Sequence, residues 1–188
     1  ANKNQLSGNL YSVLNDLHLR DRFPVNLIED FKLFYIKQWM MNEQIAKETE
    51  RLAELFVKSE KEAIFLKGPF LVERFYGNID RRPIQDIDIL VRKEEVDSVD
   101  RLLKRSGFKR NSTIFFNKSL TIYFTHHFEY RKQDTLLDLH WVLTNHFSFN
   151  LNYEAIWKKK QKFIFKNKAF YILSDEDEIV FKILSVFM

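Results

Sequence analysis

The stretch "RRPIQDIDILV", residues 81–91, places two acids inside a segment whose other residues are suited to burial. Its apolar residues are the β-branched and aliphatic types of a buried strand: Ile84, Ile87, Ile89, Leu90 and Val91. Asp86 and Asp88 are two residues apart, so in a strand both project from one face, with Cα atoms roughly 6.6 Å apart. Two carboxylates about 4 Å apart repel by roughly 4 kcal/mol at an effective dielectric of 20. A divalent cation reverses that sign, and oxygen ligands of this kind suit Mg²⁺ or Mn²⁺.

A second acid-bearing strand is predicted from "TLLDLHWVL", residues 135–143, where Asp138 lies inside an apolar run with His140 on the same face. Three carboxylates from two neighbouring strands can hold two metal ions. The alternative is that Asp86 and Asp88 lie on a solvent-facing side of the sheet, and their spacing alone favours neither interpretation. For His140 we favour a histidine packed beside Trp141 over a direct catalytic role. Its expected supporting role is a hydrogen bond that orients Asp138.

A candidate phosphate loop precedes the acid pair. In "FLKGPF", residues 65–70, a predicted strand ends at Lys67-Gly68 just before a predicted helix. Such a turn offers backbone N–H groups and an ammonium group to a phosphate chain. Glycine at a strand-to-helix turn is common, so the position of this turn before the two acids is what makes it a candidate.

The remaining pattern predicts an α+β or mixed α/β domain with one central sheet, and we favour α+β. Helical spacing is expected over residues 3–19, 27–58, 71–77, 93–107 and from 174 onward, and strands over 63–66, 84–91, 108–117, 120–130, 134–143 and 169–173. We predict an N-terminal helical segment over 1–59, a catalytic-type domain over 60–173, and the start of a truncated C-terminal helical region over 174–188. "KKKQK", residues 158–162, is interpreted as a solvated connector.

Composition limits the environment and the partners. The chain has no cysteine, which excludes disulfides and thiolate metal sites and is typical of the cytoplasm. It has no apolar run long enough to span a membrane. The formal net charge is +4, with lysines and arginines scattered, so long nucleic acid is the least favoured partner. The apolar stripe of the helix over 27–58 is interpreted as core, with self-association as the alternative.

Together these motifs resemble a known family. The series "FLKGPFLVERFYG", "RRPIQDIDILV", "LLKRSGF" and "LLDLHW" is similar to the uncharacterised nucleotidyltransferases of bacteria, a branch of the polymerase-beta-like superfamily. The resemblance covers roughly residues 60–145, with a weaker match in "LSDEDEIVFKIL". It implies a nucleotidyltransferase-like mixed central sheet flanked by helices.

The resemblance also implies roles for single residues. Asp86 and Asp88 would bind Mg²⁺ (or Mn²⁺) and the nucleoside triphosphate, while Asp138 would complete a second metal site and help to activate an acceptor hydroxyl. Phosphate contacts are expected from Lys67, Gly68 and Arg82. The alternative for Arg82 is a surface arginine held by the turn that follows it.

The implied reaction is metal-dependent transfer of a nucleotide from a triphosphate such as ATP to an unidentified hydroxyl on a small molecule, a sugar or a protein. One residue departs from the superfamily pattern: Pro69 follows Gly68 where serine or glycine is usual. Proline has neither a hydroxyl nor an N–H, although it begins a helix well. A catalytically weak nucleotide-binding or regulatory module with the same fold therefore stays open. A third interpretation is an ordinary globular domain with surface acids.

Overall fold

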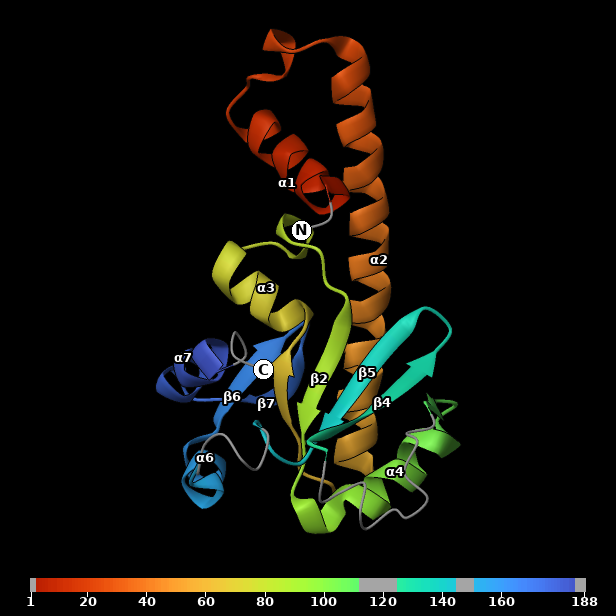
Figure 1. Ribbon diagram of the computed structural model, residues 1–188, viewed down its shortest axis with the longest axis vertical. Helices are drawn as coiled ribbons and strands as arrows, with labels where there is room; N and C mark the ends of the chain where they lie inside the picture. The colour runs from red at the N-terminus through yellow and green to blue at the C-terminus, as the bar shows by residue number, and fades with distance from the viewer. Residues whose placement is uncertain (1–2, 112–124, 145–150, 185–188) are drawn as a thin grey trace. The chain divides into compact units, whose positions relative to one another are not determined.

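The computed structural model describes residues 3–111, 125–144 and 151–184, and these residues form a mixed seven-stranded sheet (Figure 1). The strand order is β3-β4-β5-β2-β1-β7-β6. The strands are β1 (Ile64–Lys67), β2 (Asp86–Leu90), β3 (Lys109–Arg110), β4 (His127–Lys132), β5 (Thr135–His140), β6 (Gln161–Phe165) and β7 (Lys168–Ile172). β2 pairs with β5 in parallel and β1 with β7 in parallel, whereas the other pairs are antiparallel. This confirms the predicted α+β class.

Six α-helices accompany the sheet in the described part of the chain. They are α1 (Lys3–Asp16), α2 (Val25–Lys58), α3 (Pro69–Tyr76), α4 (Val96–Arg105), α6 (Tyr153–Lys159) and α7 (Asp175–Leu184). None of the described helices is long and apolar enough to cross a membrane.

The chain divides into two compact units, one made of residues 1–49 with 68–85 and the other of residues 50–67 with everything from 86 onward. The whole sheet lies in the second unit. The helix α2 contributes to both units, because its last turns pack on the sheet of the second. The domain boundaries that the sequence predicts at 59 and 173 stay predictions.

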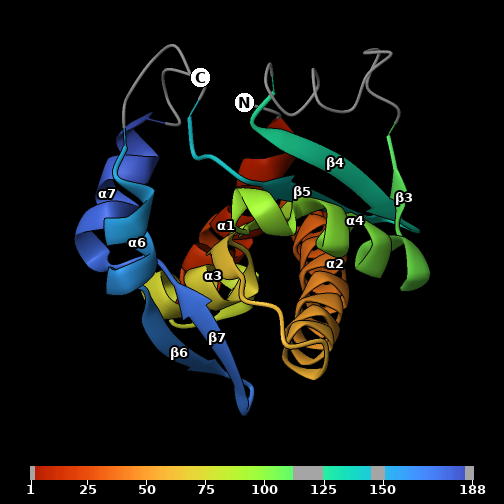
Figure 2. The same cartoon turned by 90° about the horizontal axis from the view of Figure 1, so that it is seen from below.

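The two faces of the sheet bury different partners. On one face, Phe65 of β1 packs edge-on against Phe56 from the end of α2, with ring centroids 6.4 Å apart. The other face carries an apolar cluster that joins strand residues to α6 and α7: Ile64, Leu66, Leu90, Leu143, Ile156, Trp157, Leu173 and Phe181. Figure 2 shows α6 and α7 next to each other, beside β6 and β7. The acids of β2 lie on this second face, the one that also carries Leu90, because strand residues alternate between faces.

Local signals explain where several helices begin and end. Pro69 is the first residue of α3, and Gly77 ends that helix in the left-handed region, φ +76°, with its N–H donated to the Glu73 carbonyl. At α7, the Ser174 hydroxyl accepts a hydrogen bond from the Asp177 N–H and donates one to the Asp177 carboxylate. These caps confirm the predicted helix boundaries at Gly77 and Ser174.

The prediction for residues 158–162 was wrong in one respect. The lysines there are mostly exposed, but they form the last turn of α6 and the start of β6 rather than a connector. Lys160 pairs with Glu62 at 3.3 Å and lies 4.9 Å from the ring centroid of Tyr171. Neither α6 nor β6 was predicted. The predicted strand segments 112–117 and 120–124 lie outside the described residues.

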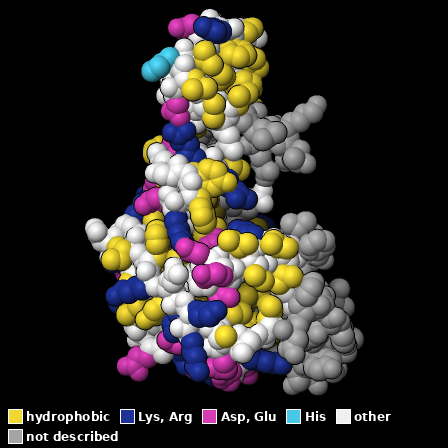
Figure 3. Space-filling model, turned by 90° about the vertical axis from the view of Figure 1, so that its left-hand side faces the viewer, with side chains coloured by type: hydrophobic (Ala, Val, Ile, Leu, Met, Phe, Trp, Pro, Cys, Tyr) yellow, Lys and Arg dark blue, Asp and Glu magenta, His cyan; other side chains and the backbone are white. Residues whose placement is uncertain are grey.

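Apolar side chains remain on the surface of the first unit, as Figure 3 shows over its helices. The exposed ones on α1, on α2 and between them are Leu10, Val13, Leu17, Phe23, Val25, Leu33, Ile36, Trp39, Met40 and Met41. The predicted apolar stripe of α2 is buried at Ile45, Leu52 and Phe56 and exposed at Met41. Most other exposed apolar residues of α2 lie off this stripe, and self-association through the helix stays a prediction.

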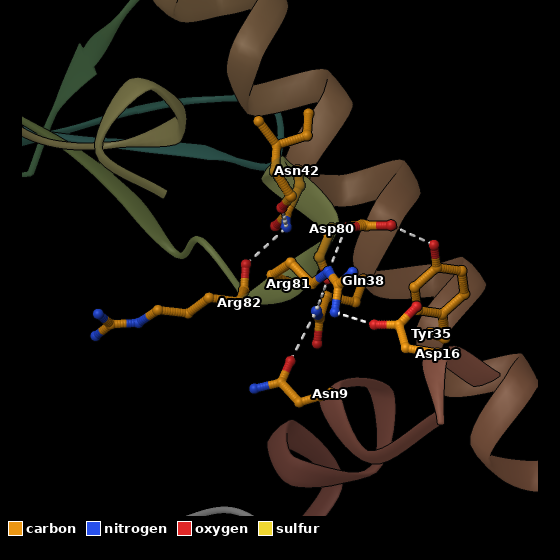
Figure 4. A network of polar contacts seen from close by, with 9 residues as sticks. Asn9, Asp16, Tyr35, Gln38, Asn42, Asp80, Arg81 and Arg82 are labelled. Atoms are coloured by element: carbon orange, nitrogen blue, oxygen red, sulfur yellow. Dashed lines mark hydrogen bonds and ion pairs between the residues drawn. The ribbon is translucent and has the colours of Figure 1, made fainter. Parts of the chain in front are cut away.

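A polar network in the first unit holds the segment that precedes β2 (Figure 4). The buried Asn42 of α2 donates from Nδ2 to the carbonyl oxygens of Ile79 and Arg82, at 2.5 and 2.8 Å. Its Oδ1 accepts the N–H of Ile84 at 2.9 Å. Asn42 therefore fixes the backbone on both sides of Pro83.

The same segment has further supports from α1 and α2. Gln38 donates to the Asp80 carbonyl at 2.8 Å and to Asn9 at 3.1 Å. Tyr35 donates its hydroxyl proton to the Asp80 carboxylate, and Arg81 pairs with Asp16 of α1. The polar side chains of these helices thus replace the backbone partners that an irregular segment lacks.

We expect Asn42→Ala to lower the free energy of unfolding by about 2 kcal/mol or more, because it leaves three backbone groups without their partner. Urea unfolding measures the change. Gln44→Ala, at an exposed position of the same helix, is the matched control and should stay within about 0.5 kcal/mol of wild type. Equal effects of the two substitutions would contradict this role for Asn42.

Candidate active site

Three carboxylates share one face of the sheet. β2 and β5 run parallel, and Asp88 pairs directly with Asp138 across them. Cross-strand partners project from the same face, and Asp86 joins them because it lies two residues before Asp88. Asp88 is only 1% exposed, so it is not a surface acid, whereas Asp86 and Asp138 are half-buried.

A β-bulge turns Lys67 toward these acids. Phe65 of β1 pairs with Ile89 of β2, so a regular antiparallel ladder would place Leu66 opposite Asp88. The register instead shifts between Phe65 and Lys67, and Lys67 becomes the partner of Asp88. Bulges re-aim side chains in this way. As a result, Lys67 Nζ lies 3.4 Å from Asp88 Oδ1, with the lysine side chain 36% exposed.

His140 is the second partner of Asp88. Its Nε2 lies 3.0 Å from Asp88 Oδ1, and since a carboxylate only accepts, the imidazole donates this hydrogen bond. Both side chains are buried. The sequence predicted that His140 would orient Asp138, and this was wrong in the choice of acid: the hydrogen bond goes to Asp88.

The environments of the three acids separate their pKa values. Burial raises the pKa of Asp138 to about 6, and the charge of Asp88 adds to the shift. Burial, followed by the same charge, raises the pKa of Asp86. Burial also acts to raise the pKa of Asp88, but the hydrogen bond from His140 and the charge of Lys67 outweigh it, so its pKa is lowered. Asp88 is therefore the acid that stays ionised most readily.

Gly68 follows Lys67 with backbone angles that only glycine adopts readily, φ +136° and ψ −167°. It caps the N-terminus of α3, whose first residue is Pro69. Arg82, the other predicted phosphate ligand, is exposed, and its carbonyl oxygen is held by Asn42.

The family of uncharacterised nucleotidyltransferases matches residues 1–187. The chain belongs to this family. The suspected resemblance is thereby confirmed, and the chain is assigned to an enzyme class, nucleotidyl transfer. No curated protein matches the sequence closely enough to serve as a relative.

One solved structure supports the fold of this nucleotidyltransferase. It is the crystal structure of the lincosamide antibiotic adenylyltransferase LnuA with lincomycin bound. The two chains are 19% identical, the match covers 72% of this chain and 84% of that chain, and the TM-score is 0.52. At this level of identity the likeness shows a shared fold, and it confirms the predicted nucleotidyltransferase-like architecture.

The acid face of the nucleotidyltransferase fits a divalent cation. Asp88, Asp138 and His140 each offer a ligand atom, and these atoms lie within 4.8 Å of one another. Asp88 Oδ2 is buried and has no hydrogen-bond partner among the described residues. A buried acceptor without a donor is a position that a cation can satisfy. Asp86 is not in this group of three, although its pKa responds to the charge of Asp88.

Sequence reasoning missed three polar residues on or beside the same face. Glu129 of β4 pairs with Asp138, and His127 pairs with His140, so both project to the acid side of the sheet. His126, just before β4, lies near them, with its ring centroid 4.3 Å from that of His127. The signal was the alternation in "HFEY", residues 127–130, where Phe128 and Tyr130 are buried and their neighbours are not.

A cavity of about 400 Å³ lies elsewhere in the second unit. It is lined by residues that follow the carboxyl ends of β2 and β5, among them Arg92 and Trp141, and by Tyr153 and Trp157 of α6. Asp86, Asp88 and Asp138 do not line it, and Asp86 lies at the opposite end of β2.

In metal-free protein, we expect Asp138 to make stability depend on pH. Its folded pKa of about 6 is above the usual aspartate value of 3.8, so its contribution to stability is fully present below about pH 4 and is lost as the pH rises to about 6. The free energy of unfolding of wild type, relative to Asp138→Asn, should therefore fall across this window. Urea unfolding in the presence of a chelator measures it.

The exposed Asp97→Asn in α4 controls for the substitution itself. A difference between wild type and Asp138→Asn that is constant from about pH 4 to about pH 6, or that grows in favour of wild type, would contradict the burial and repulsion assigned to Asp138.

Proposed function

We propose that this protein transfers a nucleoside monophosphate from a nucleoside triphosphate to an acceptor hydroxyl, in a reaction that depends on a divalent cation. One observation carries the proposal: in a member of a nucleotidyltransferase family, a buried Asp88 stands directly opposite Asp138 with a lysine 3.4 Å away. Repelling carboxylates in one place are costly unless a cation joins them.

The reaction forms one bond and breaks another at the α-phosphorus. The acceptor oxygen bonds to phosphorus, the bond to the bridging oxygen breaks, and pyrophosphate leaves with the electron pair of that bond. Mg²⁺ or Mn²⁺, when bound, supplies positive charge to the phosphate oxygens and to the attacking oxygen. The protein contributes mostly by positioning and by neutralising charge.

Each acid has a distinct proposed role. Asp86 and Asp88 hold the cation beside the triphosphate, and the hydrogen bond from His140 to Oδ1 orients Asp88 so that Oδ2 is left for the ion. Asp138 completes the metal site across β2 and β5, and it also orients the acceptor hydroxyl and receives its proton. Its pKa of about 6 in the metal-free protein leaves it mostly ionised at neutral pH, which is the form that binds a cation.

The phosphate contacts are assigned to three residues near the start of β2 and the end of β1. The half-exposed Lys67 has protons left for a phosphate oxygen after its contact with Asp88. Gly68 lets the backbone approach a phosphate closely, since it has no side chain. Arg82 lies four residues before Asp86, and Asn42 holds its backbone.

Pro69 is the observation that favours a second candidate, a catalytically weak nucleotide-binding or regulatory module. It removes one N–H from the loop that would otherwise hold the triphosphate. Binding of a triphosphate with Mg²⁺, without release of pyrophosphate over long incubation, would favour this candidate.

The acceptor is proposed to be a hydroxyl on a small molecule, a sugar or a protein, and the first triphosphate to test is ATP. The structural neighbour is an adenylyltransferase solved with an antibiotic bound, which supports a small acceptor on this fold. The net charge is only +4, and the lysines and arginines are scattered along the sequence. Long nucleic acid is therefore the least favoured acceptor. A bacterial, cytoplasmic setting is proposed from the family resemblance and the lack of cysteine.

The test is transfer of label from [α-³²P]ATP, and then from the other triphosphates, to acceptors in a bacterial extract with Mg²⁺ or Mn²⁺. We expect wild type to label an acceptor and release pyrophosphate. Asp88→Asn should lose at least about a hundred-fold in rate, because it removes a ligand and a charge at the reacting phosphate.

The matched control is Asp97→Asn, the same substitution at an exposed position of α4, which should label the acceptor at the wild-type rate. Label transfer that Asp88→Asn leaves intact would contradict the proposal.

A further inference from the structure

A group of three histidines adjoins the acid face. One ring nitrogen from each of His126, His127 and His140 lies within 4.8 Å of the others. The ring centroids of His127 and His140, which pair across β4 and β5, are 5.1 Å apart, and those of His126 and His140 are 5.9 Å apart. The proposed transfer reaction uses His140 alone, so His126 and His127 need another explanation.

Two of the rings have a carboxylate oxygen near one ring nitrogen. His140 Nε2 is held by Asp88 at 3.0 Å, and His127 Nε2 lies 3.7 Å from Glu129 Oε1. In both rings, Nδ1 is buried and has no hydrogen-bond partner in the described part of the chain. A carboxylate on one ring nitrogen and a metal on the other is the usual arrangement of a ligating histidine.

We propose that His126, His127 and His140 form a site for a divalent transition ion such as Zn²⁺ or Co²⁺, separate from the Mg²⁺ position between the carboxylates. Three imidazole nitrogens with water in the fourth position suit these ions, whereas Mg²⁺ prefers oxygen. Nitrogens bound at about 2.0–2.1 Å in a tetrahedral site are roughly 3.3 Å apart. The present arrangement therefore needs to close by at most about 1.5 Å, which side-chain rotation can supply.

The protonation state of the cluster is compatible with metal binding. Burial lowers the pKa of His127 to about 4, and the nearby rings of His140 and His126 add to the shift. His127 is therefore neutral at physiological pH, which is the form that binds a metal. His140 also donates a hydrogen bond to Asp88. An ion bound to the histidines would therefore affect cation binding at the carboxylates, and this coupling can be measured without the transfer reaction.

The test is a titration of the full chain with Co²⁺ in saturating Mg²⁺, followed by visible absorption. Tetrahedral Co²⁺ absorbs much more strongly than octahedral Co²⁺, so the spectrum reports the geometry. We expect one equivalent to bind with a tetrahedral spectrum, and Zn²⁺ to displace it. His126→Ala and His127→Ala should each weaken binding at least about ten-fold.

The control is His18→Asn, which removes a histidine from the other unit at a left-handed position, φ 54°, that asparagine tolerates. It should bind Co²⁺ like wild type. If His127→Ala does not fold by circular dichroism, His127→Gln and the half-buried His126→Ala carry the test.

Two results would overturn the proposal. One is an absence of Co²⁺ binding to folded wild type. The other is Co²⁺ binding that survives His126→Ala and His127→Ala but is lost in Asp138→Asn, which would place the ion at the carboxylates.

Discussion

The site depends on the way one buried carboxylate is held. Asp88 is almost fully enclosed, and Lys67 and His140 both contact the same oxygen, Oδ1. These two partners keep Asp88 ionised despite its burial. Because both contact Oδ1, the other oxygen, Oδ2, has no partner among the described residues. Asp138 and Asp86 then meet a fixed negative charge, and this charge adds to the effect of burial in raising their pKa values.

The fold supplies this arrangement through strand register. The parallel pairing of β2 with β5 sets Asp88 opposite Asp138, and the bulge in β1 brings Lys67 into the same row. Glu129 of β4 continues the row on the far side of Asp138. A one-residue slip in either pairing would move these side chains to the opposite face, where Phe65 packs against Phe56. Burial of the apolar face thus fixes the register that the chemistry needs.

Much of the fold followed from periodicity in the sequence. The two-residue spacing of Asp86 and Asp88 inside an apolar run predicted a shared face, and the acid within 135–143 predicted a second strand beside it. Caps at Gly77 and Ser174 marked helix ends because those residues have specific backbone roles. The helix α6 and strand β6 were missed because the consecutive lysines interrupt the spacing of apolar residues that would mark a helix or a strand.

Parts of the site could not be read from the sequence, for physical reasons. Alternation along "IFLK", residues 64–67, would place Lys67 on the face of Phe65, and only the bulge brings it to the acids. His140 makes its hydrogen bond to Asp88 and not to Asp138, and this partner depends on side-chain geometry across two strands. Asn42 was passed over because hydrophobic spacing identifies the apolar stripe of a helix and gives no sign of a buried amide that holds a distant turn.

The central claim is that a divalent cation joins the carboxylates of β2 and β5. A crystal structure of the protein grown with Mn²⁺ and a non-hydrolysable ATP analogue tests it directly, through the anomalous scattering of the metal. The account predicts a peak in contact with Asp88 Oδ2 and Asp138, beside the triphosphate. A bound nucleotide with no such peak, or with Mn²⁺ held away from both acids, would contradict it.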